Sequence, residues 1–135
     1  MSLRISSEVA TPADGRAWKV LIRLAEGRLR SPLYQYVWAY GINKSDRSGT
    51  NLTGFEREVG EASSGFHVFL KYANAMEQTV ADPIVAFGNY RHKCVLVEVL
   101  VRPEHLVAAG RWFIGYKPTA VYTQVELLGP FTGNA

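Results

Sequence analysis

With 135 residues, 47% of them hydrophobic and 20% charged, the chain can bury a core as one domain, and this composition excludes wholesale disorder. A lone cysteine, Cys94, excludes an internal disulfide, and no apolar run approaches the ~20 residues of a membrane helix, so we expect a cytoplasmic protein without membrane contact. The net charge of +3 arises in residues 1–50, where eight basic and four acidic residues give +4. Such a basic half can attract nucleic acid, a phosphate-bearing ligand or an acidic protein.

The first half of the chain predicts two strands and a long loop. Residues 1–16 are polar and rich in turn residues, and we expect them to form a flexible N-terminal arm. Residues 17–24 alternate apolar and polar side chains, which is typical of a strand with one buried face. A second strand is expected over residues 33–40. Residues 41–60 are polar and contain several glycines, so they predict a loop of a length that is often functional.

The second half predicts three more strands, one main helix and a tail. In chain order these are a strand at 65–70, the main helix at 71–80, a buried central strand at 94–101, one or two helical turns at 103–110, a last strand at 120–128 and a tail at 129–135. We therefore expect an α+β fold. It would be a single domain over residues 17–128, with a mixed, twisted sheet of five to seven short strands and one main helix.

The sequence contains no motif of a metal, nucleotide or thiol site. His67, His92 and His105 are isolated, and nothing resembles HExxH or paired cysteines, so no metal site is expected. Neither glycine-rich phosphate-binding pattern is present. Cys94 lies on the predicted core strand, where a thiol behaves as a small hydrophobic group.

The order of the expected elements resembles that of a known family. Arg23 lies on the first strand, Ser63 and Ser64 open a middle strand, and Gln124 and Glu126 share one face of the last strand. In this order the chain resembles the ADP-ribosyltransferase-like superfamily. The resemblance implies NAD as cofactor, with Arg23 holding its phosphates and Gln124 and Glu126 supporting the ribose cation that forms as nicotinamide leaves. The family's Ser-Thr-Ser signature is here Ser-Ser-Gly. We therefore expect a weak or non-catalytic domain that binds a nucleotide-type ligand or a macromolecular partner.

A row of aromatic residues supports an alternative from another class. Tyr34, Tyr36, Trp38 and Tyr40 fall on one side of the second expected strand, close to the basic residues. Such a row can bind protein or stack on nucleic acid, as in a non-enzymatic interaction module of the viral or phage accessory type, or it can be a core face. His67 is either a ligand-binding residue or a histidine bonded to backbone carbonyls. The sequence leaves open whether the chain self-associates.

One carboxylate is out of place in the expected core. Glu98 interrupts the apolar strand at 94–101. A buried carboxylate needs a hydrogen-bonding or charged partner, or it remains protonated. Arg23, on a neighbouring expected strand, is the partner that we predict.

Overall fold

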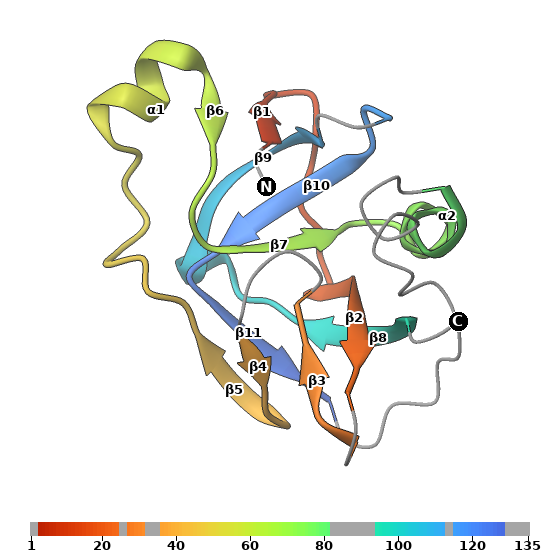
Figure 1. Ribbon diagram of the computed structural model, residues 1–135. Coiled ribbons are helices and arrows are strands. Elements are labelled where there is room, and N and C mark those ends of the chain that lie inside the picture. The colour runs from red at the N-terminus through yellow and green to blue at the C-terminus, as the bar shows by residue number, and fades with distance from the viewer. Residues whose placement is uncertain (1–2, 25–26, 32–35, 82–93, 113–114, 129–135) are drawn as a thin grey trace.

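The computed structural model describes residues 3–24, 27–31, 36–81, 94–112 and 115–128, apart from the side chains of 78–81. These residues form an eleven-stranded sheet in which every strand pair is antiparallel, together with two short α-helices (Figure 1). The elements are β1 (Leu3–Ile5), β2 (Arg16–Arg23), β3 (Leu29–Arg30), β4 (Val37–Trp38), β5 (Gly41–Lys44), α1 (Gly54–Val59), β6 (Glu61–Ala62), β7 (Phe66–Phe69), α2 (Tyr72–Ala81), β8 (Cys94–Leu100), a 3-10 turn (Pro103–His105), β9 (Leu106–Trp112), β10 (Pro118–Tyr122) and β11 (Gln124–Leu127).

The predicted α+β class, with a mixed sheet of five to seven strands and one main helix, is wrong. Several of the additional strands have only two or three residues, too few to show a period in the sequence. Of the one or two helical turns expected at 103–110, a single 3-10 turn at Pro103–His105 is present, and residues 106–110 belong to β9 instead. Pairing with β10 and β1 on its two sides overrides the local helical preference of the alanines in this segment.

The expected N-terminal arm contributes a strand. β1 lies between β9 and β6, and its Leu3 is completely buried. The approach is so close that a Cβ atom at Gly110 would lie 1.9 Å from the backbone oxygen of Arg4, so this position requires glycine. The expected tail, residues 129–135, lies outside the described residues.

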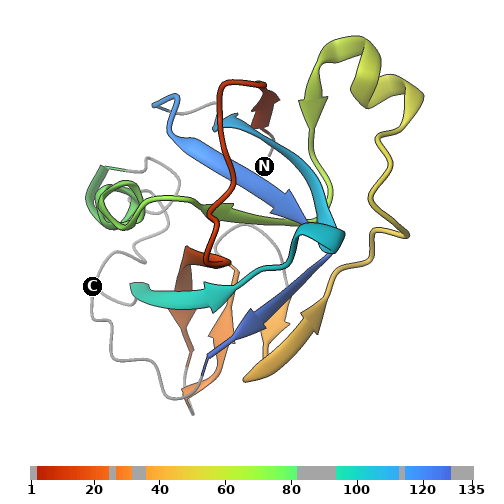
Figure 2. The same ribbon diagram turned by 180° about the vertical axis from the view of Figure 1, so that it is seen from behind.

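The sheet consists of two halves that meet at β2 and β7. Its strand order is β5-β11-β8-β2-β7-β10-β9-β1-β6. β2 pairs with β8 at seven positions but with β7 at one, where Trp18 lies opposite Phe69. Beyond this point β3 takes the same edge of β2, at Ile22 and Arg23. In both views β9 and β10 lie on one side of β7, and β8 and β11 lie on the other (Figures 1 and 2).

Both faces of β2 are buried, unlike the one-sided strand that its sequence predicts. Ala17 and Leu21 belong to a large cluster that includes side chains of β7, β8 and β11. Val20 points to the opposite face and packs in a second cluster with Phe69 and with Ala75 of α2. The strand and the helix are therefore fixed by apolar burial on two layers, which is the main stabilising force in the fold.

Lys19 lies where β2 and β7 separate. Its side chain is buried on the face shared with Leu21, and its Nζ donates a hydrogen bond of 2.7 Å to the backbone oxygen of His67. The ammonium also lies 5.7 Å from the ring centroid of Trp38, within the range of a cation–π contact. Among the described residues no carboxylate lies within 4.0 Å of it. Burial without an ionic partner lowers the pKa of Lys19 to about 8.

Substitution Lys19→Met tests this buried amine through the pH dependence of stability. The pKa falls from 10.5 in the unfolded chain to about 8 in the fold, so between these values the unfolded state binds the extra proton. The free energy of unfolding of the wild type should therefore rise with pH in this range. Relative to Lys19→Met it should gain about 2–3 kcal/mol between pH 7 and pH 10 in urea titrations. Parallel pH profiles of the two proteins would contradict the assignment.

Candidate functional site: a clamped helix

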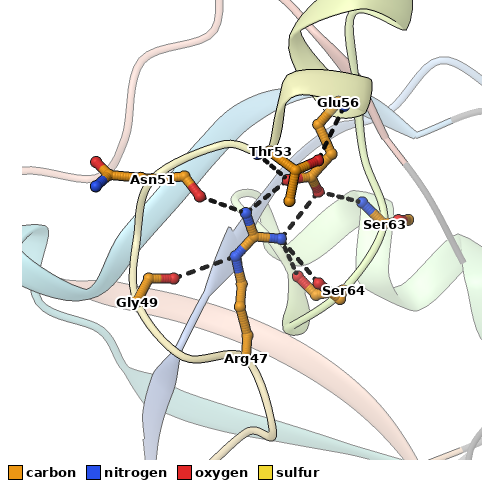
Figure 3. Close-up of polar contacts among 7 residues, drawn as sticks. All are labelled: Arg47, Gly49, Asn51, Thr53, Glu56, Ser63 and Ser64. Carbon is orange, nitrogen blue, oxygen red and sulfur yellow. Dashed lines mark hydrogen bonds and ion pairs between the residues drawn. The ribbon is translucent and has the colours of Figure 1, made fainter.

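The densest polar centre in the described residues surrounds the guanidinium group of Arg47 (Figure 3). Its Nη1 and Nη2 donate to the two carboxylate oxygens of Glu56, at 2.9 and 2.6 Å. The remaining bonds go to the backbone oxygens of Gly49, Asn51 and Ser64 and to the hydroxyl of Ser64, at 2.8–3.3 Å. Two parallel charge-assisted bonds are the strongest pairing that arginine makes. We call this centre the Arg47 clamp.

The clamp holds helix α1 by its first turn. Thr53 is the N-cap, its side chain accepts from the amide of Glu56, and the Glu56 carboxylate accepts from the amide of Thr53 in return. This reciprocal capping box satisfies two amides that a helix start leaves unpaired. Gly60 ends the helix in the left-handed conformation, at φ 72°, and its amide donates to the backbone oxygen of Glu56. One carboxylate therefore organises both the beginning of the helix and the loop before it.

The Arg47–Glu56 pair is more buried than an ordinary surface ion pair. The side chains of Arg47 and Glu56 are 7% and 6% exposed. The hydrogen bonds from Arg47 hold the pKa of Glu56 at about 2, and bonds from the amides of Thr53 and Ser63 act in the same direction. Bonding to Glu56 raises the pKa of Arg47 in turn. Removal of either partner would leave a buried charge unpaired, which typically costs about 3–5 kcal/mol.

Helix α1 presents apolar side chains to solvent. Phe55 is 72% exposed and Val59 is 44% exposed, four residues apart and so on one face of the helix. Glu56 is the buried residue of the helix. Figure 1 shows α1 at the periphery of the molecule, beside β6. A surface helix usually turns its apolar side inward, whereas in α1 the apolar side chains are exposed and a charged one is buried.

The catalytic residues implied by the family resemblance are not brought together. Glu126 of β11 lies opposite Leu100 of β8, and Leu100 lies opposite Arg16 at the beginning of β2. Arg23 is seven residues further along β2, which corresponds to ~23 Å of extended strand. The two side chains also face opposite sides of the sheet. Arg23 shares the side of Leu21 in the large core cluster, whereas the neighbours of Glu126 fill that cluster and turn Glu126 away from it.

Gln124 and Ser63 also lie apart from any common centre with Arg23. Gln124 is two residues before Glu126 on β11 and pairs with Lys44 of the edge strand β5. The amide of Ser63 donates to Glu56, and Ser64 bonds to Arg47, so the serine segment belongs to the clamp.

The expected ion pair between Arg23 and Glu98 is replaced by another. Glu98 bonds to Arg16, with 3.2 Å between the charged atoms. Both side chains are partly exposed to solvent, so this carboxylate is not a buried group as its apolar surroundings in the sequence predict. The pair belongs to the surface and has a minor effect on stability.

His67 is a buried residue of β7 rather than a residue of an open site. Burial, followed by the charge of Lys19, lowers the pKa of His67 to about 3, although carbonyl groups of Ala62 and Gly65 act against this shift. The ring is therefore neutral at neutral pH. Its Nε2 atom is buried and has no hydrogen-bond partner among the described residues, and the ligand-binding role of His67 stays a prediction.

The aromatic row does not form a surface. The rings of Tyr36 and Trp38 pack on Phe66 of β7, with centroids 4.9 and 4.6 Å away, and Trp38 is buried. Tyr40 is exposed, beyond the end of β4. Tyr34 lies outside the described residues. The core interpretation therefore holds for Tyr36 and Trp38, and the strand expected at 33–40 is limited to β4 within the described residues.

Comparisons with known proteins do not assign the chain to a family. No protein-family model, no curated protein and no solved structure matches the chain. Among the described residues, no group of three or more histidine, cysteine or acidic side chains could hold a metal ion. No helix in this part of the chain is long and apolar enough to cross a membrane.

Sequence reasoning missed the clamp, although one signal was present. Thr53-Gly54-Phe55-Glu56 has the spacing of a capping box, and it lies in the segment that predicts only a polar loop. Arg47 gives no comparable signal, because four of its six bonds go to atoms whose position depends on the folded loop.

Acid titration of Glu56→Gln tests the clamp. Because the pKa of Glu56 falls from 4.5 to about 2 on folding, its contribution is complete above pH 4.5 and is lost as the pH falls toward 2. The wild type should lose about 3 kcal/mol more than Glu56→Gln between pH 5 and pH 2. Glu58→Gln, on the same helix but exposed, is the matched control and should follow the wild type. Equal acid sensitivity of Glu56→Gln and wild type would refute the role of this carboxylate.

Proposed function

We propose that the protein is a non-enzymatic interaction module that binds a protein partner through Phe55 and Val59 of α1. One observation carries the proposal: the helix is anchored by a buried ion pair while its apolar residues remain outside. A helix of six residues is not stable alone, so its position depends on the clamp. Exposed apolar side chains held on a fixed element are typical of a binding surface.

The geometry favours insertion into a partner's groove over a flat contact. Two apolar side chains cover far less than the ~800 Å² that each side of a stable interface buries. A protruding aromatic residue can nevertheless act as an anchor in an apolar pocket, where a few residues supply most of the binding energy. The clamp reduces the ordering cost of binding because α1 is already formed. Arg57 and Glu58 place both signs of charge around the apolar pair, and this suits a polar rim.

The ADP-ribosyltransferase-like function suggested by the order of elements stays a prediction, and the proposal above does not depend on it. Glu126 of β11 lies level with the beginning of β2, whereas Arg23 lies at the end of β2 and on the opposite face of the sheet, so their arrangement gives that hypothesis no support. We further propose that the module acts in the cytoplasm, where the single, buried cysteine Cys94 remains reduced.

Substitution of Phe55→Ser together with Val59→Ser tests the module. A matched control is Tyr40→Ser with Ile42→Ser, since these side chains are also an aromatic and an aliphatic residue, 57% and 50% exposed. A photo-crosslinking phenylalanine analogue at position 55, introduced in the native cell, should capture a protein that the same analogue at position 40 does not. The α1 double variant should bind the captured partner at least tenfold more weakly, whereas the control variant binds normally.

The unfolding free energy of the double variant shows whether Phe55 and Val59 serve binding or support the fold. Because both side chains of α1 are exposed, the double variant should unfold within about 0.5 kcal/mol of the wild type. A loss of several kcal/mol would mean that Phe55 and Val59 support the fold, and absence of any position-specific crosslink would reject the interaction module.

A further inference from the structure

We propose that the outer edge of β5 (Gly41–Lys44) pairs with the same edge of a second copy of this chain, which makes a symmetric dimer. The two copies of β5 would run antiparallel, so that β8, β11 and β5 of both copies form one continuous sheet. In both views β5 lies at the margin of the molecule, at the far end from α1 (Figures 1 and 2). The inference does not depend on the function proposed for that helix.

The backbone of β5 is paired on one edge. This strand ends the order of the sheet and pairs with β11. The amide of Ser45 donates to the backbone oxygen of Thr123 at 2.9 Å, and in an antiparallel pair the hydrogen-bonding residues alternate along each strand. The backbone groups of Asn43 therefore point to β11, and those of Ile42 and Lys44 point to the opposite edge. Among the described residues no strand pairs with that edge.

The side chains beside these unpaired backbone groups are exposed, although one of them is large and apolar. Ile42 is 50% exposed, and Lys44 is also exposed. Both lie on the outer face of the sheet, because Asn43 between them is buried on the inner face. Unpaired donors and acceptors next to an exposed apolar side chain are a template for another strand.

One register uses both outward residues of the strand. If Ile42 lies opposite Lys44 of the second copy, symmetry also places Lys44 opposite the second copy's Ile42. Both are then hydrogen-bonded pairs, which gives about four backbone hydrogen bonds across the interface. Pairing of Ile42 with its own copy, or of Lys44 with its own copy, leaves the other outward residue opposite a residue outside β5. The first register is therefore the one that we infer.

The same register compensates the charge of Lys44. A lysine on an edge strand usually discourages pairing. Lys44 lies opposite Gln124 of β11, and Glu126 lies opposite Ile42, all on one face of the sheet. Neither Lys44 nor Glu126 has an ion-pair partner among the described residues. In the dimer, Lys44 is followed across the sheet by Ile42 and then Glu126 of the second copy, two strand spacings or about 10 Å away, which the two long side chains can span.

The size of the edge predicts weak association. Two strands of four residues cover far less than the ~800 Å² that each side of a stable interface buries. We therefore expect a Kd between about 10 μM and about 1 mM.

Sedimentation equilibrium of the full-length protein over this range of concentration tests the dimer. The wild type should show a monomer–dimer equilibrium. Lys44→Glu and Glu126→Lys should each weaken dimerisation at least tenfold, because each places like charges close together twice in the symmetric interface. The variant with both substitutions restores opposite charges and should dimerise within about threefold of the wild type.

Two controls separate the edge from a general effect of net charge. Lys71→Glu and Glu58→Lys make the same changes in net charge at exposed positions of the two helices and should dimerise like the wild type. Thermal unfolding confirms that each variant is folded. A monomer throughout the concentration range, or edge variants that dimerise like the wild type, overturns the proposal. Dimerisation that is lost in Phe55→Ser with Val59→Ser but kept in Lys44→Glu also overturns it, because self-association then belongs to α1.

Discussion

The two halves of the sheet share a single backbone pair between β2 and β7, at Trp18 and Phe69. One pair of residues supplies too few backbone hydrogen bonds to hold two groups of strands together, so side-chain contacts must also connect them. On one face Lys19 reaches from β2 to the carbonyl of His67, and the ring of Trp38 packs beside it on Phe66. On the other face α2 packs across β2, β7 and β8. In the order of paired strands the two halves are joined through β2 and β7, and the large apolar cluster contains side chains of both halves.

Two buried cations serve this scaffold through different chemistry. Arg47 has a carboxylate partner and four further acceptors, so its charge is compensated and permanent. Lys19 has a carbonyl and an aromatic ring, which satisfy the geometry of its ammonium group but do not neutralise it. The arginine therefore anchors a loop at all pH values at which Glu56 is ionised. The lysine instead connects two strands, and the free-energy cost of burying its charge disappears when the amine loses its proton.

The sequence predicts the longer elements of this fold but not its class. The period of two in β2 and the apolar run of β8 come from residues that pack on a core, and both strands lie within one or two residues of their expected bounds. Helix α2 also lies within one residue of its expected bounds, but Tyr72 and Met76, whose spacing predicts it, are exposed, and Ala75 is the residue that packs on the core. β3, β4 and β6 have two residues each and exist because a partner strand pairs with them. Long-range pairing of this kind leaves no local pattern, and neither do the backbone acceptors around Arg47. The capping box is the part of the candidate site that a local sequence pattern can predict, because its two side chains, Thr53 and Glu56, are only three residues apart.

The distribution of polar and apolar side chains is the physical basis of the binding role that we propose. Among the buried polar residues of the described chain, Lys19 and Glu56 are bonded to backbone groups. Large apolar side chains such as Phe55 and Tyr72 are left outside on elements that the polar groups and the core hold in place. Burying such side chains against a partner would release free energy that the fold itself does not use, and this is the driving force on which the proposed binding role depends.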